Sequence, residues 1–187
     1  MKKSTFITMI TFVLTVLVSA NVNAQDFAKL DKSPMDAASF PTSYKDANKL
    51  VKIVYSRPQL NGREVSALAK NGEVWRTGAN EAAELTLYKD MKLGNTTVEA
   101  GTYTFYLIPG DTEWTAIISK DLNVWGSYFY KEANDVARLK VPVSSGDAID
   151  AFSIAFTEDG NTINMNLGWE LLELLCLLPN KALGFRL

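Results

Sequence analysis

The stretch GTYTFYLIPGDTEWTAIIS, residues 101–119, decides the fold class. Residues 101–109 alternate with a period of two, and both alternating sets are largely apolar. This pattern is typical of a central strand that is covered on both faces. The polar break Asp111-Thr112-Glu113 separates this run from a second one at residues 114–119. Two strand patterns with so short a break between them predict a β-hairpin.

Further strand patterns lie on both sides of this hairpin, and each has apolar residues at every second position. Pro142 within one of them indicates an edge or a bulge, because proline cannot donate to a ladder. Seven strands with almost no helical periodicity predict an all-β fold, an antiparallel β-sandwich that is jelly-roll-like or a partly open barrel. The other five patterns are at residues 49–56, 83–89, 137–143, 152–156 and 163–167, the last two joined by a turn at 158–161.

The predicted sandwich domain spans residues 49–170 and contains one short helix. Residues 63–70 carry the helical pattern, and Asn71-Gly72 is a typical helix C-terminus. Residues 25–48 are polar and contain two prolines, so we expect them to form an irregular arm that wraps the sandwich. No Pro-rich or Ser-rich linker divides the chain, which predicts one compact domain.

The first 24 residues have the pattern of a cleaved secretory signal peptide. Two lysines precede an apolar run at residues 6–18, and Val22-Asn23-Ala24 forms a cleavage site. We therefore expect a periplasmic or secreted protein. The apolar run is shorter than the roughly 20 residues that a membrane helix needs, so we expect no stable membrane span after cleavage. Retention of the segment as an uncleaved anchor is the alternative.

Composition excludes several classes of function. The chain of 187 residues has 19 Lys and Arg against 21 Asp and Glu, which argues against nucleic-acid binding. It has no His and one Cys, which excludes His-based triads, histidine zinc sites and internal disulfides. Glycine patterns for nucleotides and acidic runs with metal-loop spacing are both missing, so we expect neither a cofactor nor a metal.

The last 17 residues, 171–187, break the strand pattern because they hold eight leucines. Three interpretations stay open: a hydrophobic tail for a membrane or partner, a terminal helix or strand, and the product of a reading-frame change. Cys176 lies in this tail between apolar neighbours, and such a cysteine is usually buried and inert.

The residues that could bind a ligand are concentrated between positions 55 and 81. Arg supplies a planar fork of donors, Trp a stacking face, and Asn both a donor and an acceptor. Together they predict a site for a small anionic or carbohydrate ligand, centred on the WRTGANE stretch at residues 75–81. The candidate ligand-binding residues are Arg57, Arg63, Trp75, Arg76, Asn80 and Glu81.

The same residues also have a purely structural interpretation, which we favour because spacing alone does not bring side chains into one cleft. Arg76 and Glu81 could pair with each other, and Asn80 could bind turn backbone. Trp75 could be an anchor of the core.

Five features together resemble the bacterial exported-protein family catalogued as domain of unknown function 2911. They are YSRP (55–58), NGR (61–63), WRTGANEA (75–82), AGTY (100–103) and the Trp114 strand, behind an export signal. The resemblance extends from about Ser33 to Trp169, and after it the Leu-rich tail replaces the polar-alternating strand of the family. It implies an exported protein without an established activity. The signature positions are Arg57, Pro58, Gly62, Arg63 and residues 75–81, none of them assigned to catalysis.

Two functions from different classes follow. The first is a non-enzymatic binding or structural module of the cell envelope. The alternative is a hydrolase that works without His, acting on a periplasmic saccharide or ester through two carboxylates. Glu81 and Glu84 are one candidate pair, although three positions on a strand would point them to opposite faces. Glu81 with Asp111 is the other pair.

Aromatic residues gather at positions 125 and 128–130. They could form an exposed platform on which a sugar stacks, or they could pack into the core. We favour core packing from the sequence.

Overall fold

The computed structural model describes residues 26–179, with side chains to residue 170. It divides into two compact units, Met1–Leu30 and Asp31–Leu187, and all regular structure described here belongs to the second. The predicted signal segment, the end of the Leu-rich tail and the side chain of Cys176 lie outside the described residues.

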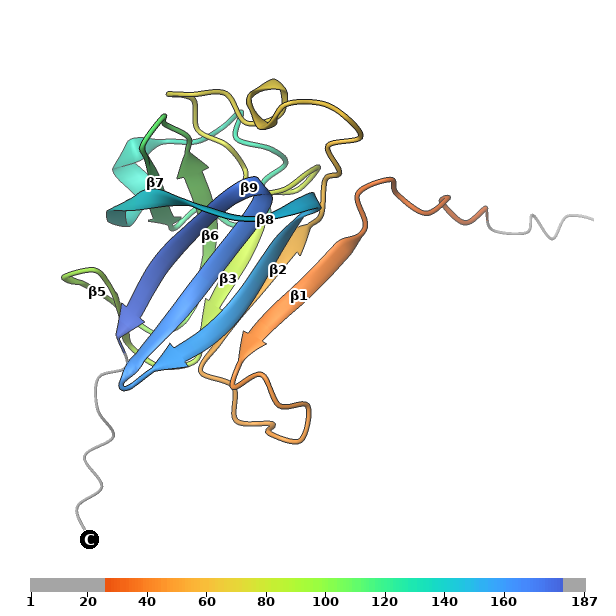
Figure 1. The fold of residues 1–187 in the computed structure, drawn as a ribbon. Helices are drawn as coiled ribbons and strands as arrows, with labels where there is room; N and C mark the ends of the chain where they lie inside the picture. The colour runs from red at the N-terminus through yellow and green to blue at the C-terminus, as the bar shows by residue number, and fades with distance from the viewer. Residues whose placement is uncertain (1–25, 180–187) are drawn as a thin grey trace, which may run out of the picture. The chain divides into compact units, whose positions relative to one another are not determined.

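Seven strands form one antiparallel sheet in the order β1-β2-β3-β6-β7-β8-β9, and β4 with β5 forms a second, small sheet (Figure 1). The prediction of an all-β antiparallel fold is confirmed. The strands are β1 (Met35–Phe40), β2 (Val51–Ser56), β3 (Ala83–Leu87), β4 (Met91–Leu93), β5 (Thr96–Val98), β6 (Gly101–Ile108), β7 (Glu113–Ser119), β8 (Asp135–Asp159) and β9 (Thr162–Pro179).

The expected central hairpin is formed by β6 and β7. Tyr106 pairs with Ile117, and both side chains are fully buried although neither belongs to the main core. Phe105, next to Tyr106 in β6, points to the other face and into the core. Both faces of the hairpin are therefore covered, as the two-sided apolar pattern predicts.

One long strand, β8, replaces the two strands predicted at residues 137–143 and 152–156. Its first part pairs with β7 as far as Pro142, and from Val143 onward it pairs with β9. Register shifts follow between Ser145 and Ile149. These irregularities let the strand bend without ending, which an alternating pattern alone does not reveal.

The second part of β8 folds back onto the other side of the core and nearly closes the sheet. Phe152 donates its N–H to the Pro58 carbonyl over 2.9 Å, and Leu60 donates to the Asp150 carbonyl over 3.0 Å. Figure 1 shows the hairpin of β8 and β9 lying over β2 and β3. The architecture thus lies between the sandwich and the partly open barrel that the sequence predicts.

The expected irregular arm at residues 25–48 contains a strand. β1 pairs with β2 from Met35 opposite Ser56 to Phe40 opposite Val51. The sequence of β1, MDAASF, has no alternating apolar face, and its first three residues are exposed. Its pairing with β2 therefore comes from the tertiary structure and not from local preference.

The helix expected at residues 63–70 is reduced to one 3-10 turn, η1 (Val65–Ala67). The preceding Glu64 is extended and provides no side-chain cap, so nothing supports a longer helix. A second 3-10 turn, η2, spans Glu132–Asn134. Within the described part of the chain, no helix is long and apolar enough to cross a membrane.

The core lies between β2, β3, β6 and β7 on one side and the β8–β9 hairpin on the other. Leu85 and Ile53 from the first layer are fully buried, as is Met165 from β9. The small β4–β5 sheet adds Met91, Leu93 and Val98 to the same cluster.

The backbone of β9 continues through residues 171–179 of the Leu-rich segment. Leu174 pairs with Val143 and Leu172 pairs with Ser145. The first half of this segment is thus a strand of the sheet.

Candidate functional site: two paired loops

Two loops lie side by side next to the central hairpin. The first loop is residues 76–82, and the second loop is residues 121–131. Ala82 donates its N–H to the Val124 carbonyl over 3.0 Å, and Gly126 donates to the Asn80 carbonyl over 2.9 Å. The paired backbones hold the two loops together as one surface.

The first loop has an unusual backbone conformation. Thr77 and Asn80 have φ values of +53° and +61°, and Gly78 has a φ of +153°. A Cβ on Gly78 would lie 2.9 Å from the backbone oxygen of Ser56, so the loop runs directly against the end of β2. Glycine is required at this position for both reasons, and positive φ at two other residues is a strain that is often stored at functional sites.

Trp75, directly before the first loop, is an anchor of the core and is 4% exposed. Its ring stacks on Trp169 with centroids 5.2 Å apart and meets Phe152 edge to face at 5.0 Å. Its backbone pairs with Leu107 of β6. The prediction that Trp75 offers a stacking face to a ligand is therefore wrong, because other rings already cover both the face and the edge.

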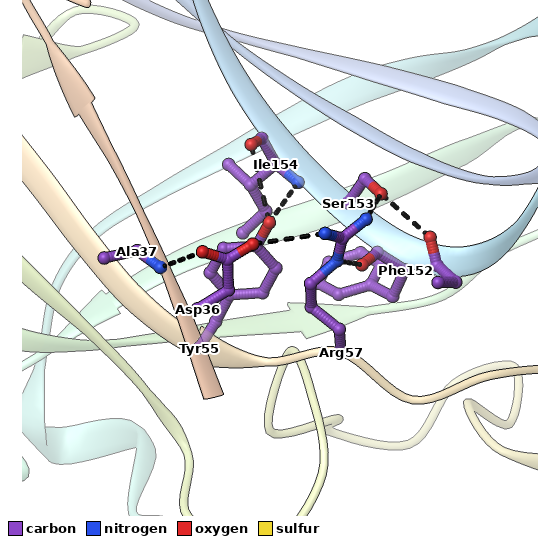
Figure 2. Close-up of polar contacts among 8 residues, drawn as sticks. Asp36, Ala37, Tyr55, Arg57, Phe152, Ser153 and Ile154 are labelled. Carbon is purple, nitrogen blue, oxygen red and sulfur yellow. Dashed lines mark hydrogen bonds and ion pairs between the residues drawn. The ribbon is translucent and has the colours of Figure 1, made fainter. Parts of the chain in front are cut away.

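Arg57 ties the end of β2 to β8 and β1, as Figure 2 shows. Its Nε donates to the Phe152 carbonyl over 3.1 Å, and Nη2 donates to Ser153 Oγ over 2.6 Å. Nη1 forms an ion pair with Asp36 at 3.2 Å. Each of the three guanidinium nitrogens thus bonds a group of the protein, which makes Arg57 a structural tie between strands.

Arg63 folds back on its own chain. Its Nε donates to the Leu60 carbonyl over 2.8 Å and Nη2 donates to the Gln59 carbonyl over 2.7 Å. It lines a surface pocket of about 350 Å³ beside β8, and no residue of this pocket lines the pocket of Arg76. Arg57 and Arg63 are thus not brought together with Arg76.

Arg76 is different, because its half-buried guanidinium forms no ion pair or hydrogen bond with any residue that the structure describes. Its Nε is buried without a hydrogen-bond partner. The expected pairing with Glu81 is not among the ion pairs of the described chain. Arg76 lines a pocket of about 310 Å³ together with Lys70, Ser127 and Tyr128.

Glu81 points to a different pocket, which has a volume of about 250 Å³ and is also lined by Glu84 and Asn123. A strand would point Glu81 and Glu84 to opposite faces, yet both residues line this one pocket. β3 begins only at Ala83, so the alternation of a strand does not extend back to Glu81. Asp111, the other expected partner of Glu81, instead accepts a hydrogen bond from Asn71 and is not among the residues that line the pocket of Glu81.

The second loop exposes three aromatic side chains. Trp125, Tyr128 and Phe129 are 56%, 76% and 74% exposed, so the interpretation as core packing is wrong for them. Tyr128 and Phe129 line a pocket of about 420 Å³. Tyr130 turns inward and packs edge to face on Tyr106 with centroids 5.3 Å apart.

A polar cluster lies beneath the second loop. Tyr130 donates its hydroxyl to Asp135 over 2.6 Å, and Arg138 donates to the same carboxylate over 2.7 Å. Within the described part of the chain, the Tyr106 hydroxyl and one carboxylate oxygen each of Asp121 and Asp135 are buried without a partner. Among the described residues, no three acidic, His or Cys side chains come together as a metal site.

Two tyrosines of this cluster have strongly raised pKa values. Burial is the largest cause of the rise in the pKa of Tyr106 to about 12, and the charge of Asp121 adds to it. Burial also leads the rise in the pKa of Tyr130 to about 12, followed by its hydrogen bond to Asp135. Both hydroxyls therefore keep their protons at neutral pH, and that of Tyr130 donates to Asp135.

The family model described as protein of unknown function, DUF2911, matches residues 33–175. The chain belongs to this family. The match begins just before β1 and ends within β9, so the DUF2911 domain includes the strand that we had expected to be an irregular arm. It also continues six residues beyond Trp169, the expected end of the resemblance. No curated protein and no solved structure matches the chain.

Sequence reasoning identified the first loop of this DUF2911 domain but missed the polar cluster. Asp121, Asn134 and Asp135 are scattered polar residues without motif spacing, and they meet only because the second loop folds over β6. Tyr106 was the one available signal. A large polar-tipped residue at an alternate position of a two-sided strand indicates that something covers its outer face.

Proposed function

We propose that this DUF2911 protein is a non-enzymatic binding module of the cell envelope that holds the anionic group of a small ligand at Arg76. The observation that carries the proposal is the half-buried Arg76 guanidinium, which has no partner among the residues that the structure describes. The guanidinium fork is suited to carboxylate, phosphate and sulfate groups.

The contrast among the arginines supports this assignment. Arg57, Arg63 and Arg138 each donate hydrogen bonds to groups of the protein. A buried polar group normally has a partner, and one without a partner calls for an explanation. A ligand anion in the pocket of Arg76 would supply that partner.

The charge around the pocket is also suited to an anion. Lys70 and Glu73 line the pocket and form a loose ion pair with each other at 3.8 Å. Their charges cancel, which leaves the charge of Arg76 uncompensated. The envelope location rests on the export signal at residues 1–24.

Isothermal titration calorimetry with glucuronate and with inorganic phosphate tests the proposal. We expect binding of at least one of them to the parent protein and a loss of at least tenfold in affinity in Arg76→Gln. The matched control is Lys45→Gln, which removes an exposed cation in a distant loop and should leave affinity unchanged. Equal affinities in the parent and Arg76→Gln would contradict the proposal.

One observation favours the alternative hydrolase: Glu81 and Glu84 line the same pocket. Paired carboxylates are the acid and base of glycoside hydrolysis. Hydrolysis of a saccharide or ester that stops in both Glu81→Gln and Glu84→Gln would support this function. Activity that survives either substitution would exclude that residue from the role.

A further inference from the structure

We propose that the ligand is an oligosaccharide in which an acidic sugar is linked to a neutral one. The acidic group would bind at Arg76, and the neighbouring neutral ring would stack on Tyr128 and Phe129. This inference rests on the proposed function, since it names the class of ligand for the same site.

Two pockets adjoin at Tyr128. This residue lines the pocket of Arg76, which we name the acid pocket, and also the pocket of Phe129 on the second loop, which we name the ring pocket. A ligand that fills both must therefore pass along the Tyr128 side chain. Pockets of about 310 Å³ and 420 Å³ each have room for about one sugar unit, so at least two linked units are needed.

The two pockets differ in charge. The acid pocket contains the uncompensated charge of Arg76. The ring pocket contains Asp121 and Lys131, whose charges cancel. An acidic sugar is therefore favoured in the first pocket. In the second pocket an acidic unit would gain no net attraction and would lose solvation of its charge, so a neutral sugar is favoured there.

The surface of the ring pocket is suited to a sugar ring, which has an apolar face and a polar rim. Tyr128 and Phe129 are among the most exposed large side chains of the described chain, and they supply apolar faces. Asn134 and Lys131 line the same pocket and supply hydrogen-bonding groups. Aromatic faces beside amide and charged groups fit an amphipathic ligand better than a purely apolar one.

The second loop is held in place before any ligand arrives. Its inner residue Tyr130 packs on Tyr106 and is bonded to Asp135. Ser127 donates its hydroxyl to the Val74 carbonyl over 2.7 Å, next to the core anchor Trp75. A preorganised surface loses little conformational entropy on binding, which favours recognition by a few stacked rings.

The test compares three hexasaccharides by isothermal titration calorimetry with the parent protein. A hyaluronan hexasaccharide alternates glucuronate with N-acetylglucosamine, chitohexaose is neutral throughout, and hexagalacturonate is acidic throughout. We expect the hyaluronan hexasaccharide to bind at least tenfold more tightly than either of the others. Binding of chitohexaose or hexagalacturonate with equal affinity, or no binding of the hyaluronan hexasaccharide, would overturn the inference.

Variants separate the two pockets. Phe129→Ala should weaken the hyaluronan hexasaccharide at least tenfold and leave glucuronate unchanged, whereas Arg76→Gln should weaken both. Tyr44→Ala removes another highly exposed aromatic side chain, outside the two loops, and is the matched control. The melting temperatures of the variants show that each is folded.

The failures of the two proposals are distinguishable. If Phe129→Ala leaves the hexasaccharide affinity unchanged while Arg76→Gln weakens glucuronate, the inference fails and the proposed function stands. If Arg76→Gln changes the affinity of none of the hexasaccharide, glucuronate and inorganic phosphate, the proposed function fails as well.

Discussion

The two faces of the β6–β7 hairpin are both buried, but by different kinds of groups. On the inner face, Phe105 and Leu107 belong to a continuous apolar core. On the outer face, Tyr106 lies under the second loop beside Asp121 and Asp135, and three oxygens of these side chains have no partner in residues 26–170. Burial of apolar groups stabilises a fold, whereas burial of unpaired polar groups costs free energy.

This difference assigns separate tasks to the two faces. The inner face, with Trp75 at its rim, holds the strands together. The outer face supports an exposed aromatic loop and the unpaired Arg76 guanidinium. The WRTGANE stretch contributes to both faces, since Trp75 belongs to the core and Arg76 lines the surface pocket.

Trp75→Ala should cause the largest loss of stability. Its ring contacts Trp114, Phe152 and Trp169, so its removal leaves a large cavity in the core. We expect the free energy of unfolding to fall by about 3–5 kcal/mol. Urea denaturation measures this loss. A loss smaller than about 1 kcal/mol would contradict the role of Trp75 as the anchor.

Arg57→Ala should have the next largest effect, because it removes the tie between β2 and β8. Hydrogen bonds to charged groups contribute about 1.5–3 kcal/mol, and we expect a loss of that size. Arg57→Lys tests the geometry, since an ammonium cannot reach Phe152, Ser153 and Asp36 in the same fork. Full recovery of stability in Arg57→Lys would show that charge alone is needed.

Alkaline pH should lower the stability of the protein through Tyr106, on the outer face. The pKa of Tyr106 is about 12 in the folded protein and about 10 in an unfolded chain, so between these values the unfolded chain releases a proton that the folded protein keeps. The free energy of unfolding therefore falls as pH rises from about 10 to 12. Urea midpoints across this range should fall less in Tyr106→Phe than in the parent. Identical falls would contradict the raised pKa.

Two buried tyrosines at neutral pH form a matched pair. The Tyr55 hydroxyl accepts a hydrogen bond from the Ile154 N–H over 2.8 Å, so Tyr55→Phe leaves a buried donor unpaired and should cost about 1 kcal/mol. The Tyr106 hydroxyl has no partner among the described residues, so Tyr106→Phe should be neutral or stabilising. Thermal unfolding of both variants compares them directly, and a larger loss in Tyr106→Phe would reverse the interpretation of the outer face.

Trp125→Ala should have the smallest effect on stability. Its side chain is more than half exposed, and its pairing with Glu81 uses backbone groups that the substitution keeps. We expect a change within about 0.5 kcal/mol. A loss comparable with that of Trp75→Ala would show that Trp125 also belongs to the fold and not to the exposed surface.

The sequence by itself determined the strand content and the central hairpin. Residues 101–109 alternate on both faces, and this local pattern is sufficient to indicate a strand covered twice. The sequence did not indicate β1, because MDAASF has no alternating apolar face and acquires its structure from β2. From the sequence, β8 was predicted as two strands, because a bend within one strand has the same pattern as a break between two strands.

The sequence likewise determined which residues are chemically capable of binding a ligand, but only the tertiary structure decided which are free to do so. Arg57 and Arg76 have the same side chain and lie 19 positions apart. β8 supplies acceptors to Arg57 and nothing comparable to Arg76. Partners distant in sequence determine whether a polar group is satisfied, and local patterns contain no information about them.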